Sequence, residues 1–583
     1  MRLRRIACIL FLAALVGAAF AASAAGSGSS AHLPGAAGLG SGVIVRARPG
    51  REAAAEAFVR RLGGSVRERL ALIGGFSASV PAKALAALRA NAAVLSVTWN
   101  RILAPQSANY TTDYDPASDG YSLANITQLT GARAWWAAGD TGQGVGIALI
   151  DSGVAPVQAL SSPGQVVNGP DLSLESQAPN LRYLDTYGHG TFMAGLIAGR
   201  DATPSATAPA STYLGMAPGA HIVSLKVGDA DGGTDVTQVI AAIDWVVQHR
   251  GDNGLNIRVI NLSYGTNSLQ DYRTDPLAYA AEQAWKHGLV VVAAGGNDGF
   301  QKKKGVPALA DPAADPYLLA VGSADTMSTQ KLADDQVPSF SPWPKKGSTR
   351  SVDLVAPGVH MQGLRVPNSF IDGTHPEGFL SDRYFRGTGT SESTAIVSGA
   401  AALLLQRFPE ATPDQVKKLL MDGAVRIQGK SQAVGAGELQ LGPLLGASPP
   451  NWTQNWSPST GLGSIESSRG SDHLTRDGVV LSGEQDIFGA PISTSTLAAA
   501  EAAGSSWSGG TWNGNSWSGS SWSGSSWSTS TWSGSSWSGS SWSTSQWSGN
   551  SWSGSSWSGS SWSGSSWSGS SWSGDSWAGD SWG

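Results

Sequence analysis

The sequence contains almost no cysteine and little charge. Its only cysteine is Cys8, which lies in an N-terminal segment with the features of an export signal. If that segment is removed, disulfide bonds cannot stabilise the mature chain, and packing must do so. Charged residues make up 14% of the 583 residues, against about 25% in an average soluble protein. The net charge of -5 gives no reason to expect a nucleic-acid partner.

Residues 1–25 have the pattern of a signal peptide. Three arginines precede an apolar run over residues 6–20, and small residues follow with A-x-A cleavage patterns at 19–21 and 22–24. An uncleaved membrane anchor is the alternative, because the apolar run is nearly long enough to span a bilayer. The crowding of small residues favours cleavage. We therefore expect a secreted, extracellular protein that can stay associated with the cell surface.

The last part of the chain, residues 505–583, has only two charged residues, Asp575 and Asp580. Residues 448–504 are rich in Ser, Pro and Gly with little periodicity, which predicts a linker. From 505 to 583 an approximate S-S-W-S-G pentapeptide repeats, with Trp at every fifth residue from 507. An odd period puts successive Trp side chains on alternate faces of an extended chain, which disfavours a one-faced sheet. Two interpretations stay open, a flexible Gly/Ser tail or multivalent attachment to cell-wall glycan or a surface partner.

Residues 120–447 alternate short apolar runs with helical stretches. The runs are rich in Val, Ile and Leu, as is typical of parallel strands buried on both faces; they cover 144–151, 221–227, 257–265 and 288–296. This alternation predicts an α/β fold with a doubly wound, mostly parallel sheet. Catalytic groups in such folds gather at the carboxyl ends of the strands.

Four polar residues follow or start these elements. They are Asp151 at the end of "GVGIALID", His189 in "DTYGHGTFMAGLIAG", Asn297 after "VVVAAGG" and Ser391 in "GTGTSESTAIVSGAAALLL". A serine hydroxyl becomes a nucleophile only when a base takes its proton, and histidine titrates near neutrality. An aspartate can orient the imidazole, and an amide donor can stabilise an oxyanion. A helix N-cap is the alternative role for Ser391.

In this chain order the four motifs resemble those of the subtilisin-like serine peptidases, the subtilase family. The resemblance covers residues 43 to about 447. It implies a serine endopeptidase that works through an acyl-enzyme, with Asp151, His189 and Ser391 as the catalytic triad. It also implies that Asn297 helps to stabilise the oxyanion.

The same resemblance implies a groove for an extended polypeptide substrate. Gly232 and Gly233 match the family segment that pairs its backbone with the substrate, and Ser263 and Gly265 in "NLSYG" match the opposite wall. Main-chain hydrogen bonds would give affinity, and side-chain pockets would give preference. No cofactor is expected to be required. Three aspartates in "DADGGTD" (229–235) suggest a structural calcium loop, but their spacing is short for one.

Two residues depart from the family pattern. Glu392 replaces an apolar residue directly after the nucleophile, and Ala395 replaces a proline. Alanine favours helix, so we expect the helix to continue, and we expect Glu392 to point away from the site. These departures leave an alternative function open: a catalytically inert subtilase-fold protein that binds surfaces through its Trp-rich tail.

Residues 43–104 have the sequence pattern of a small α+β domain. Their pattern predicts the order β-α-β-β-α-β, which is the ferredoxin-like arrangement. This segment resembles the inhibitory prosegment of the same family. The resemblance implies a self-processing precursor, cut near residues 104–112, whose own prosegment acts as an intramolecular inhibitor.

Overall fold

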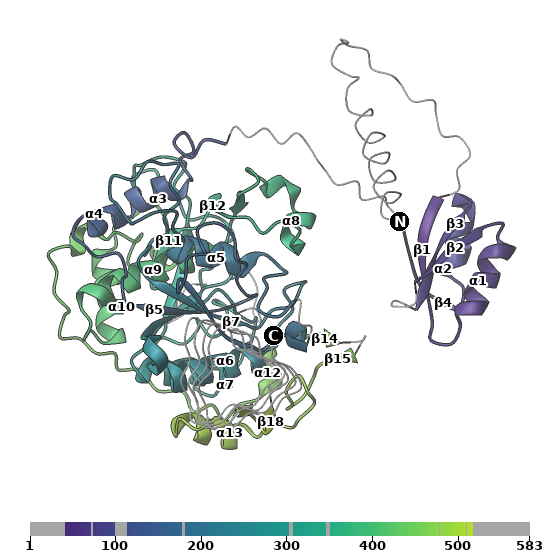
Figure 1. Ribbon diagram of the computed structural model, residues 1–583. Helices are drawn as coiled ribbons and strands as arrows, with labels where there is room; N and C mark the ends of the chain where they lie inside the picture. The colour runs from purple at the N-terminus through teal and green to yellow at the C-terminus, as the bar shows by residue number, and fades with distance from the viewer. Residues whose placement is uncertain are drawn as a thin grey trace, which may run out of the picture. The chain divides into compact units, whose positions relative to one another are not determined.

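The computed structural model divides into two compact units, residues 1–109 and residues 110–583 (Figure 1). The structure describes residues 41–516, with gaps at 71–73, 100–113, 178–180, 302–306, 346–349, 477–478 and 509. The expected signal peptide and the repeats beyond 516 lie outside the described residues. Over the described ranges, no helix combines the length and apolarity that crossing a bilayer requires.

The first unit has the β-α-β-β-α-β order that the sequence predicts. Its four strands form an antiparallel sheet in the order β2-β3-β1-β4. Val45 of β1 is fully buried and lies between Phe76 and Val97 of the neighbouring strands. The elements are β1 Ser41–Ala47, α1 Glu52–Arg61, β2 Ser65–Leu70, β3 Gly75–Val80, η2 Ala82–Ala84, α2 Leu85–Arg89 and β4 Val94–Trp99.

The second unit is built on a seven-stranded parallel sheet with the order β11-β10-β9-β8-β5-β7-β6. Every residue of the inner strand β5 is buried, as expected for an apolar run covered on both faces. The predicted parallel α/β sheet is therefore confirmed. The strands are β5 Gly146–Asp151, β6 Val166–Asp171, β7 His221–Lys226, β8 Ile257–Leu262, β9 Val290–Ala294, β10 Leu319–Ala324 and β11 Leu354–Pro357.

Helices pack on this sheet in two groups. Helix α5 contacts α9, and α9 runs across strands β8 to β11, whereas α6 packs against α7 (Figure 1). The helices are α3 Leu123–Leu129, α4 Ala132–Ala137, α5 His189–Ala198, α6 Val236–His249, α7 Pro276–Lys286, α8 Phe370–Thr374, α9 Thr390–Arg407, α10 Pro413–Gly423 and α11 Ser431–Val434. The described residues up to 447 also form a hairpin of β12 Met361–Leu364 and β13 Tyr384–Gly387. Four short 3₁₀ turns are described there as well: η3 Leu174–Gln177, η4 Asp252–Gly254, η5 Pro376–Gly378 and η6 Gly442–Leu444.

The predicted linker over 448–504 is wrong. This segment folds onto the second unit, and Ile465 and Ile492 join its hydrophobic core. Ser, Pro and Gly do supply turns here, but single apolar residues between the turns reach the core, and so no periodicity appears in the sequence. The elements are α12 Ile465–Arg469, β14 Thr475–Arg476, β15 Val479–Val480 and α13 Thr494–Ala502.

The first two Trp repeats also belong to this body. Trp507 and Trp512 face each other across the hairpin of β16 Trp507–Ser508 and β17 Thr511–Trp512, and β18 Asn515–Ser516 follows. Both indoles are buried on α6, where Trp507 Nε1 donates to the Ala241 carbonyl and Trp512 Nε1 to the Asp244 carboxylate, each at 2.7 Å. The chain reverses between these repeats, so two tryptophans an odd number of residues apart share one face. The predicted alternation is wrong for this pair.

Candidate active site

An aspartate and a histidine meet at the carboxyl edge of the sheet. Asp151 is the last residue of β5, and His189 is the first residue of α5. The His189 Nδ1 atom lies 2.8 Å from Oδ1 and 2.9 Å from Oδ2 of Asp151. The backbone N–H of Ser152 donates to Asp151 Oδ1 at 2.8 Å and fixes the carboxylate. The structure thus brings together two of the residues that the sequence singles out.

The start of α5 is held by a residue that sequence reasoning missed. The buried carboxylate of Asp185 accepts hydrogen bonds from the Gly188 N–H at 2.6 Å and the Thr191 N–H at 2.7 Å. Gly188 has a φ of 106°, and an added Cβ would lie 2.6 Å from the Ser369 hydroxyl, so the turn before His189 requires glycine. The acidic residue in "DTYGHG" was the available signal.

Ser391 is the second residue of α9, where the helix dipole favours negative charge. Its hydroxyl lies 3.4 Å from the Ser263 carbonyl, and the Ser263 hydroxyl donates to the Ser391 carbonyl at 3.2 Å. Gly389 occupies the N-cap position, and no side chain caps the helix there. The alternative role of Ser391 as an N-cap is therefore wrong.

Asn297 lies against the same helix start. Its side-chain oxygen accepts hydrogen bonds from the N–H of Thr390 at 2.9 Å and from the Thr390 hydroxyl at 3.1 Å. Because the oxygen is engaged in this way, the amide nitrogen is the end of Asn297 available as a donor. A Cβ on Gly389 would lie 3.4 Å from that nitrogen, which places the amide beside the residues leading into Ser391.

The expectation that Glu392 points away from the site is wrong. The side chain is 6% exposed, and together with His189 and Phe192 it lines a cavity of about 60 Å³. Burial raises the pKa of Glu392, and the charge of His189 opposes that rise. The expectation for Ala395 is confirmed, because α9 continues through this buried residue to Arg407.

The carboxylates around His189 control its charge. Burial lowers the pKa of His189, but the charge and hydrogen bond of Asp151, together with the charges of Glu392 and Asp185, outweigh burial and raise it to about 9. The imidazole ring is 23% exposed, so it still meets solvent on one side. At neutral pH the imidazolium predominates, and the neutral base appears as the pH rises.

Two of the expected groove residues, Gly232 and Gly265, have no room for a side chain. Gly232 has a φ of 83°, and an added Cβ would lie 2.8 Å from the ring of Tyr187. On the opposite side, a Cβ on Gly265 would lie 2.7 Å from the Cβ of Ala310. Side chains at either glycine would therefore collide with a neighbouring residue, and the backbone stays uncovered there.

Gly233 is engaged within its own turn. Its N–H donates to the carboxylates of Asp229 at 2.9 Å and Asp231 at 3.1 Å, and its carbonyl accepts from the Asp229 N–H at 3.1 Å. Substrate pairing at this residue therefore stays a prediction that requires the turn to open. Burial and the neighbouring carboxylate of Asp231 raise the pKa of Asp229 to about 7.

The third aspartate of the suggested calcium loop has a different role. Asp235 is the N-cap of α6 and forms a capping box with Gln238. Its carboxylate also forms an ion pair with Arg469 of the C-terminal segment. Among the residues with described positions, no group of three or more acidic, histidine or cysteine side chains converges as a metal site would require.

Comparison with known proteins shows the family to which the chain belongs. The model described as "Subtilase family" matches residues 142–437, just over half of the chain. Together with the parallel sheet and the Asp151–His189 pair, this match shows that the chain belongs to the subtilase family.

Three relatives illustrate the extent of the similarity. Serine protease AprX of Bacillus subtilis (strain 168) is 35% identical over 290 residues, which cover 48% of this chain and 62% of AprX. Minor extracellular protease Epr of the same organism is 29% identical over 330 residues, 56% of this chain and 42% of Epr. Subtilisin DY of Bacillus licheniformis is 30% identical over 308 residues, 52% of this chain and 92% of that protein. The chain thus spans less than two thirds of AprX and of Epr.

Proposed function

We propose that the protein is a secreted serine endopeptidase that hydrolyses polypeptides through a triad of Asp151, His189 and Ser391. The observation that carries the proposal is the Asp151–His189 pair, bonded at 2.8 Å and 2.9 Å at the carboxyl edge of the sheet. Membership of the subtilase family supports it. The position of Ser391 in the first turn of α9, beside Asn297, supports it as well.

The reaction follows from the chemistry of these groups. The Ser391 hydroxyl attacks the substrate carbonyl carbon while His189 takes the hydroxyl proton, and a C–O bond forms as the carbonyl becomes an oxyanion. The Asn297 amide and the Ser391 backbone N–H donate to that oxyanion. The C–N bond then breaks, and His189 returns the proton to the leaving amine. Water repeats the sequence on the acyl-enzyme, which releases the acid and restores Ser391. No cofactor takes part.

The orientation of His189 decides which nitrogen reacts. Because Nδ1 is bonded to Asp151, Nε2 is the nitrogen that exchanges a proton with Ser391. The buried carboxylates favour the imidazolium that forms during the attack, which lowers the barrier. They also hold the resting base in its protonated form until the pH approaches about 9. The proposed enzyme is accordingly most active in the alkaline range.

We further propose that the first unit is an inhibitory prosegment that the enzyme removes from itself near residues 104–112. Support comes from its β-α-β-β-α-β fold and its place between the expected signal peptide and the sheet unit. The name of the relative Epr describes an extracellular protease, which supports secretion. A cell-wall glycan or surface partner for the repeats beyond 516 stays a proposal that rests on their Trp content.

The alternative of a catalytically inert surface-binding protein receives less support. Its two arguments were the Trp repeats and the departures near Ser391. Trp507 and Trp512 are buried in the core and are not available to a surface. Glu392 and Ala395 leave α9 intact.

Purified protein treated with a fluorophosphonate probe tests the proposal. We expect the probe to label Ser391, and we expect Ser391→Ala to abolish labelling, casein hydrolysis and prosegment removal. Ser431→Ala, at an exposed serine, is the matched control and should leave all three unchanged. Prosegment removal in Ser391→Ala, in a host lacking other proteases, would contradict self-processing. An unlabelled wild-type protein that still binds glycan would favour the alternative.

A further inference from the structure

A short segment of the C-terminal region joins the two expected walls of the substrate groove. We call residues 464–474 the bridging segment. On one side it is bonded to the chain that follows Gly265. The Thr266 hydroxyl donates to the Ser468 carbonyl at 2.6 Å, and the Ser268 hydroxyl donates to the Ser467 carbonyl at 2.7 Å.

The same wall fixes the next turn of the bridging segment. The Asn267 side chain accepts from the Ser471 N–H at 2.7 Å and also bonds the Ser471 hydroxyl. Gly470 has a φ of 65°, and an added Cβ would lie 2.2 Å from the Asn267 side-chain oxygen. The contact is therefore close along three consecutive wall residues, and it starts only three positions after Ser263, which is bonded to Ser391.

On the other side a buried ion pair ties the bridging segment to α6. Arg469 Nε donates to Asp235 Oδ2 at 2.6 Å, and both side chains are 0% exposed. Asp235 Oδ1 also accepts from the Thr237 N–H at 3.0 Å, so one carboxylate caps the helix and holds the arginine. Asp235 lies two positions after Gly233 in sequence, which places the ion pair at the end of the first expected wall.

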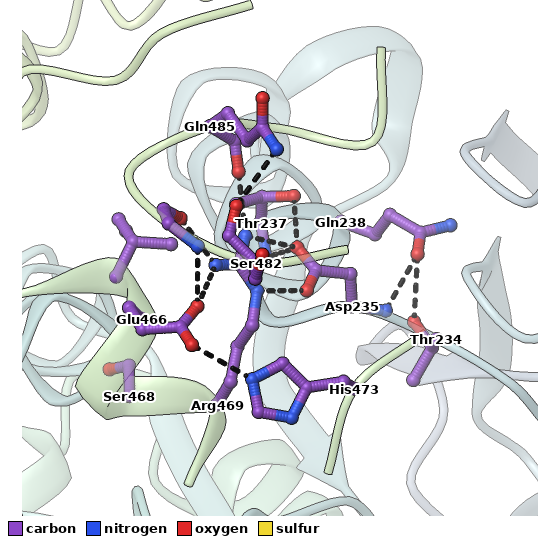
Figure 2. Close-up of polar contacts among 12 residues, drawn as sticks. Thr234, Asp235, Thr237, Gln238, Glu466, Ser468, Arg469, His473, Ser482 and Gln485 are labelled. Carbon is purple, nitrogen blue, oxygen red and sulfur yellow. Dashed lines mark hydrogen bonds and ion pairs between the residues drawn. The ribbon is translucent and has the colours of Figure 1, made fainter. Parts of the chain in front are cut away.

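The remaining donors of Arg469 bond mainly within the C-terminal region, and Nη2 also donates to Asp235 Oδ1 at 3.4 Å. Nη1 donates to Glu466 at 3.0 Å and to the Gly483 carbonyl at 2.6 Å, and Nη2 donates to the Gln485 carbonyl at 2.6 Å. Figure 2 shows the guanidinium between the carboxylates of Asp235 and Glu466. These hydrogen bonds hold the guanidinium in one orientation, and they therefore also fix the position of the bridging segment.

The network also places the last residues of the bridging segment. Glu466 accepts a hydrogen bond from His473 Nε2 at 3.0 Å, and this bond raises the pKa of His473. Leu474 follows and reaches the first wall, because a Cβ on Gly233 would lie 3.1 Å from its Cδ1 atom. Leu474 is only partly buried, so an apolar edge remains beside the expected path of the substrate.

We propose that the bridging segment is a third wall of the substrate groove, in which Leu474 contacts an apolar substrate side chain several positions before the scissile bond and Arg469 is the positioning residue. This proposal rests on the proposed peptidase function. A buried arginine–carboxylate pair adds little net stability compared with apolar residues of the same shape. What Arg469 supplies is a fixed spacing between α6 and the chain after Gly265, and hence a fixed groove width.

Peptides that differ in length test the proposal. Sites cut in casein by the wild-type enzyme supply two quenched peptides, one with roughly six residues before the bond and one with roughly two. We expect Leu474→Ala to lower kcat/KM for the long peptide about 5- to 10-fold, mainly through KM, and to change the short peptide less than about twofold. Leu462→Ala, at a leucine that is 57% exposed, is the matched control and should change neither peptide.

Arg469 variants separate positioning from folding. We expect Arg469→Ala to lose the long-peptide preference while fluorophosphonate labelling of Ser391 persists, and Arg469→Lys to restore part of the preference because it keeps the charge beside Asp235. If Arg469→Ala does not fold, Leu474→Ala decides the question. Equal effects of Leu474→Ala on long and short peptides would overturn the proposal.

The failure of the proposed function has a different signature. A wild-type protein that neither reacts with the probe nor cuts casein would refute the peptidase. The groove is then tested by binding of fluorescein-labelled casein to the Ser391→Ala protein. Leu474→Ala in that background should weaken binding about 5- to 10-fold, and unchanged binding would refute the third wall.

Discussion

The replacement Glu392→Gln should make the proposed peptidase more active at neutral pH. Glutamine keeps the shape of Glu392 and one of its acceptor oxygens, but it cannot carry the negative charge of a carboxylate in the cavity that Glu392 and His189 line. That charge stabilises the imidazolium, which cannot act as a base. Without it, the neutral imidazole is populated at lower pH.

The size of the effect follows from the charges around the ring. His189 moves from a usual pKa of 6.5 to about 9, which corresponds to about 3 kcal/mol in favour of the imidazolium. Asp151 is the largest favourable contributor and Glu392 comes next. We therefore expect Glu392→Gln to lower the apparent pKa by about half to one unit, which increases the neutral fraction near pH 7 about 3- to 10-fold.

The rate of fluorophosphonate inactivation, measured from about pH 6 to about pH 10, reports this pKa in the free enzyme. The wild-type rate should rise through an inflection near pH 9, and that of Glu392→Gln through a lower one. Glu377→Gln, which removes a charge at a side chain that is 73% exposed, is the matched control and should leave the inflection in place. A wild-type inflection near the usual histidine value, or an unchanged inflection in folded Glu392→Gln, would refute the electrostatic argument.

Three further changes test other parts of the structure. Asn297→Ala should lower kcat about 100- to 1,000-fold with KM nearly unchanged, the range measured for an oxyanion donor of a subtilisin; steady-state kinetics decide, and a loss confined to KM would contradict the donor role. Trp512→Ala should cost about 3–5 kcal/mol of unfolding free energy by the lost packing, and Trp512→Phe about 1–3 kcal/mol by leaving Asp244 without its indole donor; urea titrations measure both, and two neutral changes would show that this repeat is not part of the core. Burial raises the pKa of Glu438 well above its usual value and that of Asp335 to about 6, so the folded state binds extra protons and stability falls as the pH rises from about 5 to about 8. Glu438→Gln should reduce that fall, measured as the difference in urea midpoints at the two pH values, and an equal or larger fall would show that Glu438 does not bind an extra proton in the folded state.

The sheet and the Asp151–His189 pair could be predicted because the sequence next to each of these residues contains the signal for them. Parallel strands buried on both faces must be apolar throughout, so β5 and β9 appear as unbroken apolar runs with a polar residue at or just beyond the carboxyl end. His189 is marked by its neighbours as well, since Gly188 needs a positive φ and leaves no room for a side chain. Such constraints are visible within a few residues of the site itself.

The C-terminal region could not be predicted because its signal is not local. Asp235 and Arg469 are 234 positions apart, and neither sequence context reveals that both side chains are fully buried. The prediction for Trp507 and Trp512 failed for a different reason. The prediction applies to an extended chain, whereas β16 and β17 pair antiparallel, which returns Trp512 to the face of Trp507. Composition alone does not show which Gly/Ser stretches turn and which run straight.

The buried carboxylates at the starts of α6 and α9 have opposite consequences for pH dependence. Asp235 is paired with an arginine, which stays charged at every pH at which the protein folds, so its environment is constant. Glu392 lines the same cavity as His189 and interacts with its charge, which His189 loses as activity appears. Because the pKa of His189 is raised in the folded state, its stabilising contribution is complete below about pH 6.5 and is lost as the pH passes about 9, a change of about 3 kcal/mol. We therefore expect unfolding free energy to decline over the same pH interval in which the inactivation rate rises, and Glu392→Gln to shift both curves together to lower pH. Curves that move independently would show that a group other than His189 controls one of them.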